Sequence, residues 1–409
     1  MELKNLIAKK VENLYDEIVE SMKTFISINS VNPRTDGPGE KEVAEWLESL
    51  ISNWGFDEIK RYDAPDNAVE YGFRPNIVAL YKGTEAKRTL WIITHMDKVP
   101  AGDLSLWETD PFTPTVKDGK IFGRGAEDNG ASLIASLYGI KTLIELGIRP
   151  KDNVALAFVS DEETGSEYGI KHLLRQNIFS KDDIFIVPDA GESDGSFIEV
   201  AEKSIMWLKI TTYGIQTHAS RPQKGINAHR LGMKFAIELD EFLHKKYDAK
   251  NELFDYPYSS FEPTKKLNNV DNVNTIPGTD IIYFDCRVLP HYNIAEIYDE
   301  IMIKAEEFSK NHNVKIEISK EQFEQAAPPT PENSEIVEKL CKALKDIRGI
   351  EPKVGGIGGG TCAAIVRRAG YHAAVWASID ETAHQPNEYV KINNLIEDTK
   401  IFAYVGANF

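Results

Sequence analysis

Cysteine is scarce in this sequence. The chain of 409 residues has three cysteines, Cys286, Cys341 and Cys362. Because this number is odd and the spacings are wide, the pattern predicts neither a disulfide framework nor a zinc site built from cysteines. We therefore expect a reducing, cytoplasmic setting.

Long hydrophobic runs and an excess of basic residues are also lacking. No stretch approaches the roughly 20 apolar residues of a membrane span, and the first ten residues mix charges into their apolar positions, unlike a secretory signal. Acidic residues outnumber basic ones by 64 to 47, which gives a formal net charge of -17. That balance argues against binding to nucleic acid or to an anionic membrane.

What the chain does contain is enough apolar sequence for two domains, with 42% hydrophobic and 27% charged residues. An amphipathic helix is predicted over residues 1–29. Apolar strands are predicted at 76–81, 89–94, 154–160, 184–187 and 373–378, with helices at 43–51, 129–146 and 170–176. This alternation of strands and helices predicts an α/β domain with a largely parallel sheet.

The pattern changes near residue 204. The next elements are an alternating strand at 206–212, a helix at 227–246, a loop of roughly 30 residues, a strand at 280–289, a helix at 294–311 and a strand at 314–319. This order predicts an inserted β-α-β-β-α-β-like domain over residues 204–322. Residues 1–203 and 323–409 would then form the first domain.

The acidic triplet Asp161-Glu162-Glu163 directly follows an apolar strand. Three adjacent carboxyl groups at the end of a buried strand raise one another's pKa and are unfavourable without a cation. The triplet therefore indicates a metal site. One glutamate would bind the metal while its neighbour acts on a water molecule.

Similar side chains follow the other predicted strands. The full set is His95 with Asp97, the triplet 161–163, Asp189 and His384. Ligands of open parallel sheets bind at the carboxyl ends of the strands. Each residue alone is most simply a solvated or capping residue, and Asp128, just before a predicted helix, is as simply an N-cap. Together they favour zinc, manganese or cobalt, with enough ligands for two ions.

The motifs that carry these residues resemble the M20 metallopeptidase family. They are His95-Met-Asp97, Trp107–Phe112 with Asp118–Asp128, Asp161–Ser166 and the late His384, and they occur in the family's order over essentially the whole chain. The family includes aminoacylases, succinyl-diaminopimelate desuccinylases, acetylornithine deacetylases, carboxypeptidases and dipeptidases. The resemblance implies a zinc-peptidase-like catalytic domain with an inserted ferredoxin-like lid, through which two copies would form a homodimer.

The resemblance also implies roles for single residues. The terminal metal ligands would be His95, Glu163, Asp189 and His384, and Asp128 would bridge two divalent ions, zinc first and cobalt or manganese as alternatives. Asp97 would orient His95. Glu162 would take a proton from the water held between the metals and pass it to the leaving amine. The alternative for Glu162 is a solvated loop residue.

Six further positions resemble the family's lid and its substrate loop. His218 would stabilise the developing oxyanion, in its own site or in the neighbouring subunit's site. Asn274 and Arg287 would hold substrate, since an arginine fork suits a carboxylate, although a surface ion pair explains Arg287 as simply. Gly359, Gly360 and Thr361 would line a glycine-rich substrate loop. The loop is not expected to bind phosphate, because a P-loop lysine is lacking.

The implied function is hydrolysis of an amide bond in a small substrate that bears a carboxylate. An N-acyl amino acid is the first choice, and a dipeptidase or metallo-carboxypeptidase is the alternative. Two departures bear on the subfamily: Asn129-Gly130 stands where many members have Met-Lys-Gly, and Cys362 stands where an acidic residue or serine is common. A non-catalytic metal or amino-acid binding protein would have lost the base or a ligand, and neither is lost here.

Overall fold

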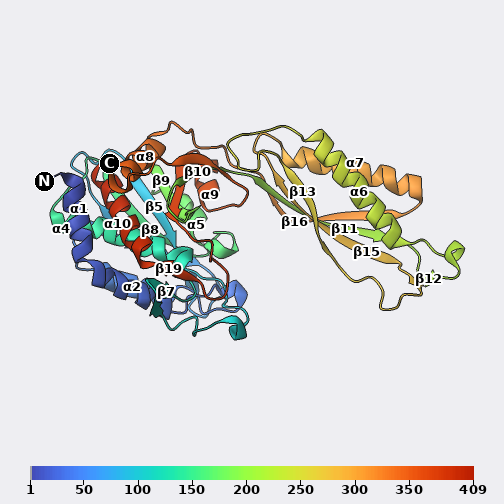
Figure 1. The fold of residues 1–409 in the computed structure, drawn as a ribbon, viewed down its shortest axis with the longest axis horizontal. Helices are drawn as coiled ribbons and strands as arrows, with labels where there is room; N and C mark the ends of the chain where they lie inside the picture. The colour runs from blue at the N-terminus through green and yellow to red at the C-terminus, as the bar shows by residue number, and fades with distance from the viewer. Residues whose placement is uncertain (1) are drawn as a thin grey trace. The chain divides into compact units, whose positions relative to one another are not determined.

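The computed structural model describes residues 2–409, and the chain divides into two compact units (Figure 1). Unit 1 comprises the residues up to Val200, Thr330–Val354 and Thr361–Phe409, and unit 2 comprises Ala201–Pro329 and Gly355–Gly360. Residues 201–203, 323–329 and 355–360, which the sequence analysis placed in the first domain, fall in unit 2 in this division. The Gly356 amide donates to the Leu253 carbonyl oxygen at 2.7 Å, which ties 355–360 to unit 2.

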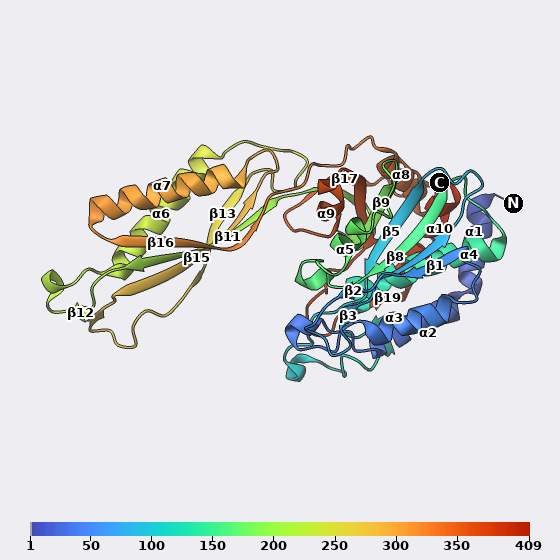
Figure 2. The same cartoon turned by 180° about the vertical axis from the view of Figure 1, so that it is seen from behind.

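The large sheet has eight strands in the order β1-β4-β8-β5-β9-β18-β10-β17. Their bounds are β1 Glu58–Arg61, β4 Ile77–Tyr81, β8 Asn153–Val159, β5 Thr89–His95, β9 Ile184–Glu192, β18 His372–Ser378, β10 Phe197–Glu202 and β17 Lys353–Ile357. The four central strands, β8, β5, β9 and β18, run parallel, whereas β4 and β10 are antiparallel to their neighbours. The carboxyl ends of the parallel strands therefore meet at one edge (Figure 2).

Helices cover both faces of this sheet. They are α1 Leu3–Asn13, α2 Tyr15–Ser27, α3 Lys41–Ile51, α4 Ser132–Leu146, α5 Ile170–Arg175, α8 Glu335–Arg348, α9 Ala363–Arg368 and α10 Ile392–Ala407. On one face α5 and α9 pack against Trp91, Ala155 and Phe185. On the other, α4 and α10 approach so closely that a Cβ added at Gly139 would lie 2.9 Å from Phe402. All seven residues of β5 are buried, as its apolar run predicts.

Several local predictions were wrong. The segment expected to be one helix contains two, Leu3–Asn13 and Tyr15–Ser27, because the chain leaves helical geometry at Leu14. The helix expected from Asn129 begins at Ser132, after a distorted turn at Ala126–Ala131. Strands β1, β10 and β17 were missed, as were the short strands β2 Ala64–Pro65, β3 Phe73–Arg74, β6 Thr115–Lys117, β7 Lys120–Phe122 and β19 Tyr389–Lys391. These strands are short, or contain charges and glycines where an apolar run would mark a strand.

Unit 2 has a four-stranded antiparallel sheet in the order β13-β15-β11-β16. Along the chain its elements are β11 Ser204–Tyr213, α6 Ala228–Lys246, β13 Ser260–Lys266, β15 Thr279–Val288, α7 Ile294–His312 and β16 Lys315–Glu324, with the short pair β12 Thr217–His218 and β14 Thr275–Ile276. This is the β-α-β-β-α-β order of a ferredoxin-like fold. Strand β13 lies in the segment expected to be a loop, because Pro263 interrupts its alternation.

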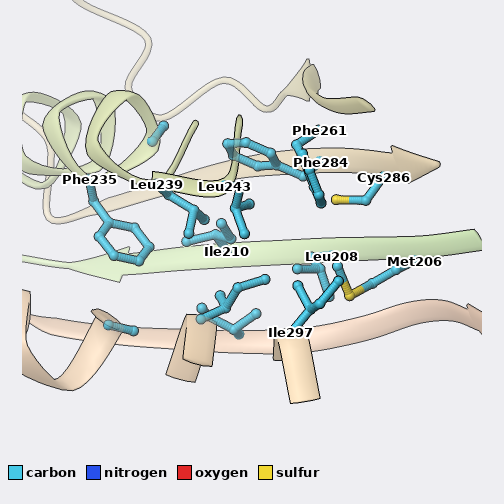
Figure 3. Packing of buried hydrophobic residues seen from close by; sticks show 14 of the residues in the cluster. Met206, Leu208, Ile210, Phe235, Leu239, Leu243, Phe261, Phe284, Cys286 and Ile297 are labelled. Atoms are coloured by element: carbon cyan, nitrogen blue, oxygen red, sulfur yellow. The ribbon is translucent and has the colours of Figure 1, made fainter. Parts of the chain in front are cut away.

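The core of unit 2 is apolar (Figure 3). Met206, Leu208 and Ile210 alternate along β11 and are buried against both helices. The helix side chains that meet them include Phe235, Leu239 and Leu243 of α6 and Ile297 of α7.

Among the helices of residues 2–409, none has both the length and the hydrophobicity needed to cross a lipid bilayer.

Candidate metal centre

The parallel strands bring the predicted site residues of unit 1 to one edge of the sheet. His95 is the last residue of β5, the triplet 161–163 follows β8, Asp189 lies in β9, and His384 follows β18. These strands are neighbours in the order β8-β5-β9-β18. Side chains that are up to 289 positions apart in the sequence are thus collected at adjacent strand ends.

Asp128 lies between the two histidines. Its Oδ1 atom is 2.8 Å from Nε2 of His95, and its Oδ2 atom is 3.0 Å from Nε2 of His384. Each carboxylate oxygen therefore faces a different imidazole. The interpretation of Asp128 as an N-cap was wrong, because α4 begins at Ser132 and follows Ala131 without a side-chain cap.

Two sets of donor atoms in this cluster suit a metal ion. The atoms of His95, Glu162 and Asp189 lie within 4.8 Å of one another, and so do those of His95, Asp128 and Glu163. Nε2 of His384 is 3.1 Å from Oε2 of Glu163. Imidazole and carboxylate donors without sulfur fit zinc, manganese or cobalt.

The charges of the cluster are unbalanced in a way that a cation would correct. Burial, followed by repulsion from Asp189, raises the pKa of Glu162 well above its usual range. Burial and the neighbouring Asp128 raise the pKa of Glu163 to about 7. Hydrogen bonds to Asp128 and Glu163 raise the pKa of His384 to about 10. Crowded carboxylates of this kind repel one another, and a divalent ion bound between them would supply the missing positive charge.

Asp97 connects His95 to the acidic turn. Nδ1 of His95 donates to the Asp97 carbonyl oxygen at 3.0 Å, which leaves Nε2 as the atom that faces Asp128. The Asp97 carboxylate accepts the backbone N–H of Glu162 at 3.0 Å and of Glu163 at 3.1 Å. Its main hydrogen bonds are therefore to the turn, and its Oδ1 lies 3.5 Å from the imidazole.

Two buried glutamates that the sequence analysis missed support this centre. Glu388 accepts the backbone N–H of Glu127 at 2.9 Å and of Asp128 at 3.0 Å, and pairs with Arg124 at 2.6 Å. The Glu127 carboxylate accepts backbone N–H groups of the loop that leads to His384, including that of Ala383 at 2.8 Å. Glu127 could have been found from the sequence, because it adjoins the predicted ligand Asp128. Glu388 stands in a polar loop, where nothing in the sequence distinguishes it.

His218 and Asn274 meet within unit 2. Strand β12 pairs with β14, and the Ala219 amide donates to the Asn274 carbonyl oxygen at 2.8 Å. Nδ1 of His218 lies 2.7 Å from Oγ of Ser220 and 3.2 Å from the Ser220 amide nitrogen. Both contacts are made by Nδ1, on one side of the imidazole ring.

The guanidinium of Arg287 already binds a carboxylate. Its Nε and Nη2 donate to Asp285 at 2.7 and 3.1 Å, and its Nη1 donates to the Gly358 carbonyl oxygen at 3.1 Å. A Cβ at Gly359 would meet nothing closer than 3.9 Å, and one at Gly360 nothing closer than 3.6 Å, so these glycines leave open space. Thr361 accepts the Ala363 amide at the start of α9.

Comparison with known proteins identifies the family. Residues 91–408 match the sequence profile of peptidase family M20/M25/M40. The chain belongs to this family. It is 44% identical to an uncharacterised metallohydrolase of Methanocaldococcus jannaschii, over 95% of this chain and 98% of that protein. It is 26% identical to a succinyl-diaminopimelate desuccinylase of Buchnera aphidicola, over 95% and 98% of the two chains.

Solved structures of M20-type enzymes share the fold. An aminopeptidase PepT from Bacillus cereus superposes with a TM-score of 0.77 at 19% identity, over 96% of this chain and 98% of that one. Human carnosine dipeptidase 1 superposes with a TM-score of 0.74 at 18% identity, over 100% and 98% of the chains. The predicted α/β fold is confirmed. This M20 protein is a metal-dependent hydrolase.

Proposed function

We propose that this M20 enzyme holds two divalent metal ions and hydrolyses the amide bond of an N-acyl amino acid. The observation that carries the proposal is the position of Asp128, whose two oxygens face His95 and His384 at 2.8 and 3.0 Å. Glu163, Asp189 and the two histidines would complete the two coordination spheres. Zinc is the first choice for both ions.

The ions, when bound, would lower the pKa of a water molecule and polarise the carbonyl that is attacked. Glu162 would accept the proton of that water and deliver it to the leaving nitrogen. Its carboxylate lies within 4.8 Å of the donor atoms of His95 and Asp189, where such a water would be held. Asp97 would hold the turn in which Glu162 lies, and Nε2 of His218 would donate to the developing oxyanion.

The substrate class is inferred from the lid and the relatives. Asn274, Arg287, Gly359, Gly360 and Thr361 are proposed to contact a substrate carboxylate, for which Arg287 would have to exchange its pairing with Asp285. The likeness to a desuccinylase of Buchnera aphidicola supports an N-acyl substrate. A dipeptidase or carboxypeptidase is the second candidate, supported by the shared fold with carnosine dipeptidase 1.

The test is a substrate panel on protein that has been stripped of metal. Zinc, cobalt or manganese is added back, and release of free amine is measured for N-succinyl amino acids, N-acetyl amino acids and dipeptides. We expect activity only with metal and mainly with N-acyl amino acids. Turnover of dipeptides alone would move the enzyme to the second candidate, and full activity without metal would reject the proposal.

We also propose a cytoplasmic homodimer formed through unit 2. The location rests on the scarcity of cysteine. The dimer is supported by apolar side chains on the surface of α6, where Met233 is 42% and Ile237 is 60% exposed. Light scattering should report a dimer for the wild type and a monomer for Ile237→Lys. A wild-type monomer would remove this part of the proposal.

A further inference from the structure

Arg74 is fully buried among carboxylates behind the acidic turn. Its Nε donates to Oε2 of Glu40 at 2.6 Å, and its Nη2 pairs with the other oxygen of Glu40. Its Nη1 lies 3.6 Å from Asp66 and 3.7 Å from Asp161. Arg74, Glu40 and Asp161 are each 0% exposed. One guanidinium thus neutralises several buried acids, an arrangement that is unfavourable unless its geometry is kept.

The same carboxylates hold the turn that carries Glu162 and Glu163. Oε1 of Glu40 accepts the amide of Asp161 at 3.2 Å. The carboxylate of Asp97 accepts the next two amides, those of Glu162 and Glu163. Three consecutive backbone N–H groups are therefore bound by two buried side chains, both of which are attracted electrostatically to Arg74.

Asp161 completes this support. Its φ of +65° places it in the left-handed region, which is unfavourable for a residue other than glycine. Its carboxylate pairs with the Thr164 hydroxyl and accepts the Tyr168 amide at 3.2 Å. The side chain of Asn32 bridges the acids by donating to Asp97 at 2.8 Å and to Asp161 at 3.4 Å. The backbone of the turn is thus fixed on both sides of Glu162.

We propose that Arg74 is a positioning residue, which acts through Glu40 and Asp97 to aim Glu162 and Glu163 at the metal centre. This inference rests on the function proposed above for those two glutamates. Removal of the guanidinium leaves Glu40, Asp97 and Asp161 as buried like charges without a counter-ion. They then move apart, and the three backbone N–H groups lose acceptors at fixed positions.

The experiment compares Arg74→Met with Arg348→Met. Arg348 is a matched control, because it pairs with the buried Asp398 between α8 and α10 and does not contact the turn. Amide hydrogen exchange is measured in metal-free protein on peptides that cover residues 160–165. We expect exchange of the 161–163 amides to accelerate about tenfold or more in Arg74→Met and to stay at the wild-type rate in Arg348→Met.

Kinetics with metal supply the second measurement. In Arg74→Met we expect kcat to fall by about tenfold or more with little change in KM, because a displaced proton carrier weakens the transition state rather than substrate binding. Arg74→Lys should recover part of both effects, since it restores the charge without the planar fork. Arg348→Met should keep the wild-type kcat.

The inference is overturned if exchange at 161–163 rises no more than elsewhere in unit 1, or if kcat falls equally in both variants. If Arg74→Met does not fold, Glu40→Gln takes its place, because it keeps the side-chain size and removes one charged acceptor. It should accelerate exchange at Asp161, and an unchanged rate there would overturn the inference. Wild-type protein without activity on any substrate would refute the proposed function, while the exchange data would still decide the role of Arg74.

Discussion

Units 1 and 2 differ in what they bury. Unit 1 surrounds its sheet edge with ionisable side chains of low exposure, among them His95, Asp97, Glu127, Glu388, Glu40 and Arg74. Unit 2 buries an apolar cluster along β11, α6 and α7, and its buried Asp280 is bound by Lys266 at 2.6 Å and Asn269 at 2.7 Å. Both units have a sheet covered by helices, so the fold class does not explain the difference.

The buried charges of unit 1 and the buried apolar side chains of unit 2 therefore do different things: the first fix the positions of reactive groups, and the second stabilise the fold. Buried charges contribute little net stability after desolvation, but they fix neighbouring groups when every one is paired. Apolar side chains stabilise through burial without fixing a reactive atom. We therefore expect substitutions at the edge of the large sheet to alter catalysis, and substitutions in the core of unit 2 to alter unfolding.

The largest effect is expected for Glu162→Gln. Loss of a general acid and base reduces kcat by about 10² to 10⁴-fold. The amide has nearly the same shape, and the turn is held by backbone hydrogen bonds to Asp97, so the free energy of unfolding should change little. Steady-state kinetics measure the first quantity and chemical denaturation the second.

The control is Glu167→Gln, which changes an exposed glutamate five positions further along that pairs with Arg175. It should keep the wild-type kcat. Metal content of Glu162→Gln then decides between two roles, because Glu162 also lies within reach of an ion with His95 and Asp189. If Glu162→Gln still binds two ions but has lost its activity, Glu162 is a proton carrier. Loss of one ion would make Glu162 a ligand and contradict the proposed mechanism.

In unit 2 we expect Leu208→Ala to lower the free energy of unfolding and to leave kcat unchanged, the opposite of Glu162→Gln. Leu208 is 0% exposed in the core, and such truncations lower the free energy of unfolding by about 2 to 5 kcal/mol. The kcat of the molecules that remain folded should not change. Ile303→Ala is the control, since Ile303 is 56% exposed on α7 and its loss should cost less than about 0.5 kcal/mol. Equal destabilisation by the two variants would contradict the apolar core as the source of stability.

The same contrast explains what the sequence could predict. The strands β5, β8 and β9 are apolar runs because helices cover both faces, and a polar residue at the end of each run was visible directly. His95, Asp161–Glu163 and Asp189 could therefore be expected at one edge. His384, a few residues beyond the apolar run of β18, belonged to the same pattern. The bridging role of Asp128 depended on the family motifs, because this residue follows no buried strand.

The residues that support the site, such as Arg74 and Glu388, could not be predicted from the sequence, for a physical reason. Arg74 pairs with Glu40, which is 34 positions away, and Glu388 binds the amide of Asp128, which is 260 positions away. Such contacts are made by the tertiary fold and leave no periodicity in the chain. Strand β13 was hidden likewise, because Pro263 and adjacent lysines resemble a loop although they suit an edge strand.

A buried lysine in unit 2 predicts a pH dependence of stability. Burial lowers the pKa of Lys203 from 10.5 to about 8, and its Nζ donates to the carbonyl oxygens of Tyr256 and Tyr258. Between pH 8 and 10.5 the unfolded chain therefore holds a proton that the folded chain lacks. Lys203 should therefore make the free energy of unfolding rise with pH across this window, by at most about 1.4 kcal/mol per pH unit.

Lys203→Met should reduce that rise, as measured by denaturation at pH 8, 9 and 10, and the part that is left comes from Lys98, whose pKa burial lowers to about 7. Lys342→Met is the control, because the hydrogen bond of Lys342 to Asp346 raises its pKa and keeps it protonated in both states over this range. It should keep the wild-type slope. A wild-type slope in Lys203→Met would contradict the lowered pKa of Lys203.

The smallest effect is expected at the start of α6. The side chain of Asn227 accepts the Arg230 amide at 2.9 Å and so caps the helix. Asn227→Ala should lower the free energy of unfolding by about 1 kcal/mol, and Asn227→Ser, which can still accept this hydrogen bond, should restore most of it. Chemical denaturation measures both. Because the cap is polar and lies at the surface, its loss should remain below that of Leu208→Ala; a larger loss would mean that unit 2 depends on its helix end more than on its core.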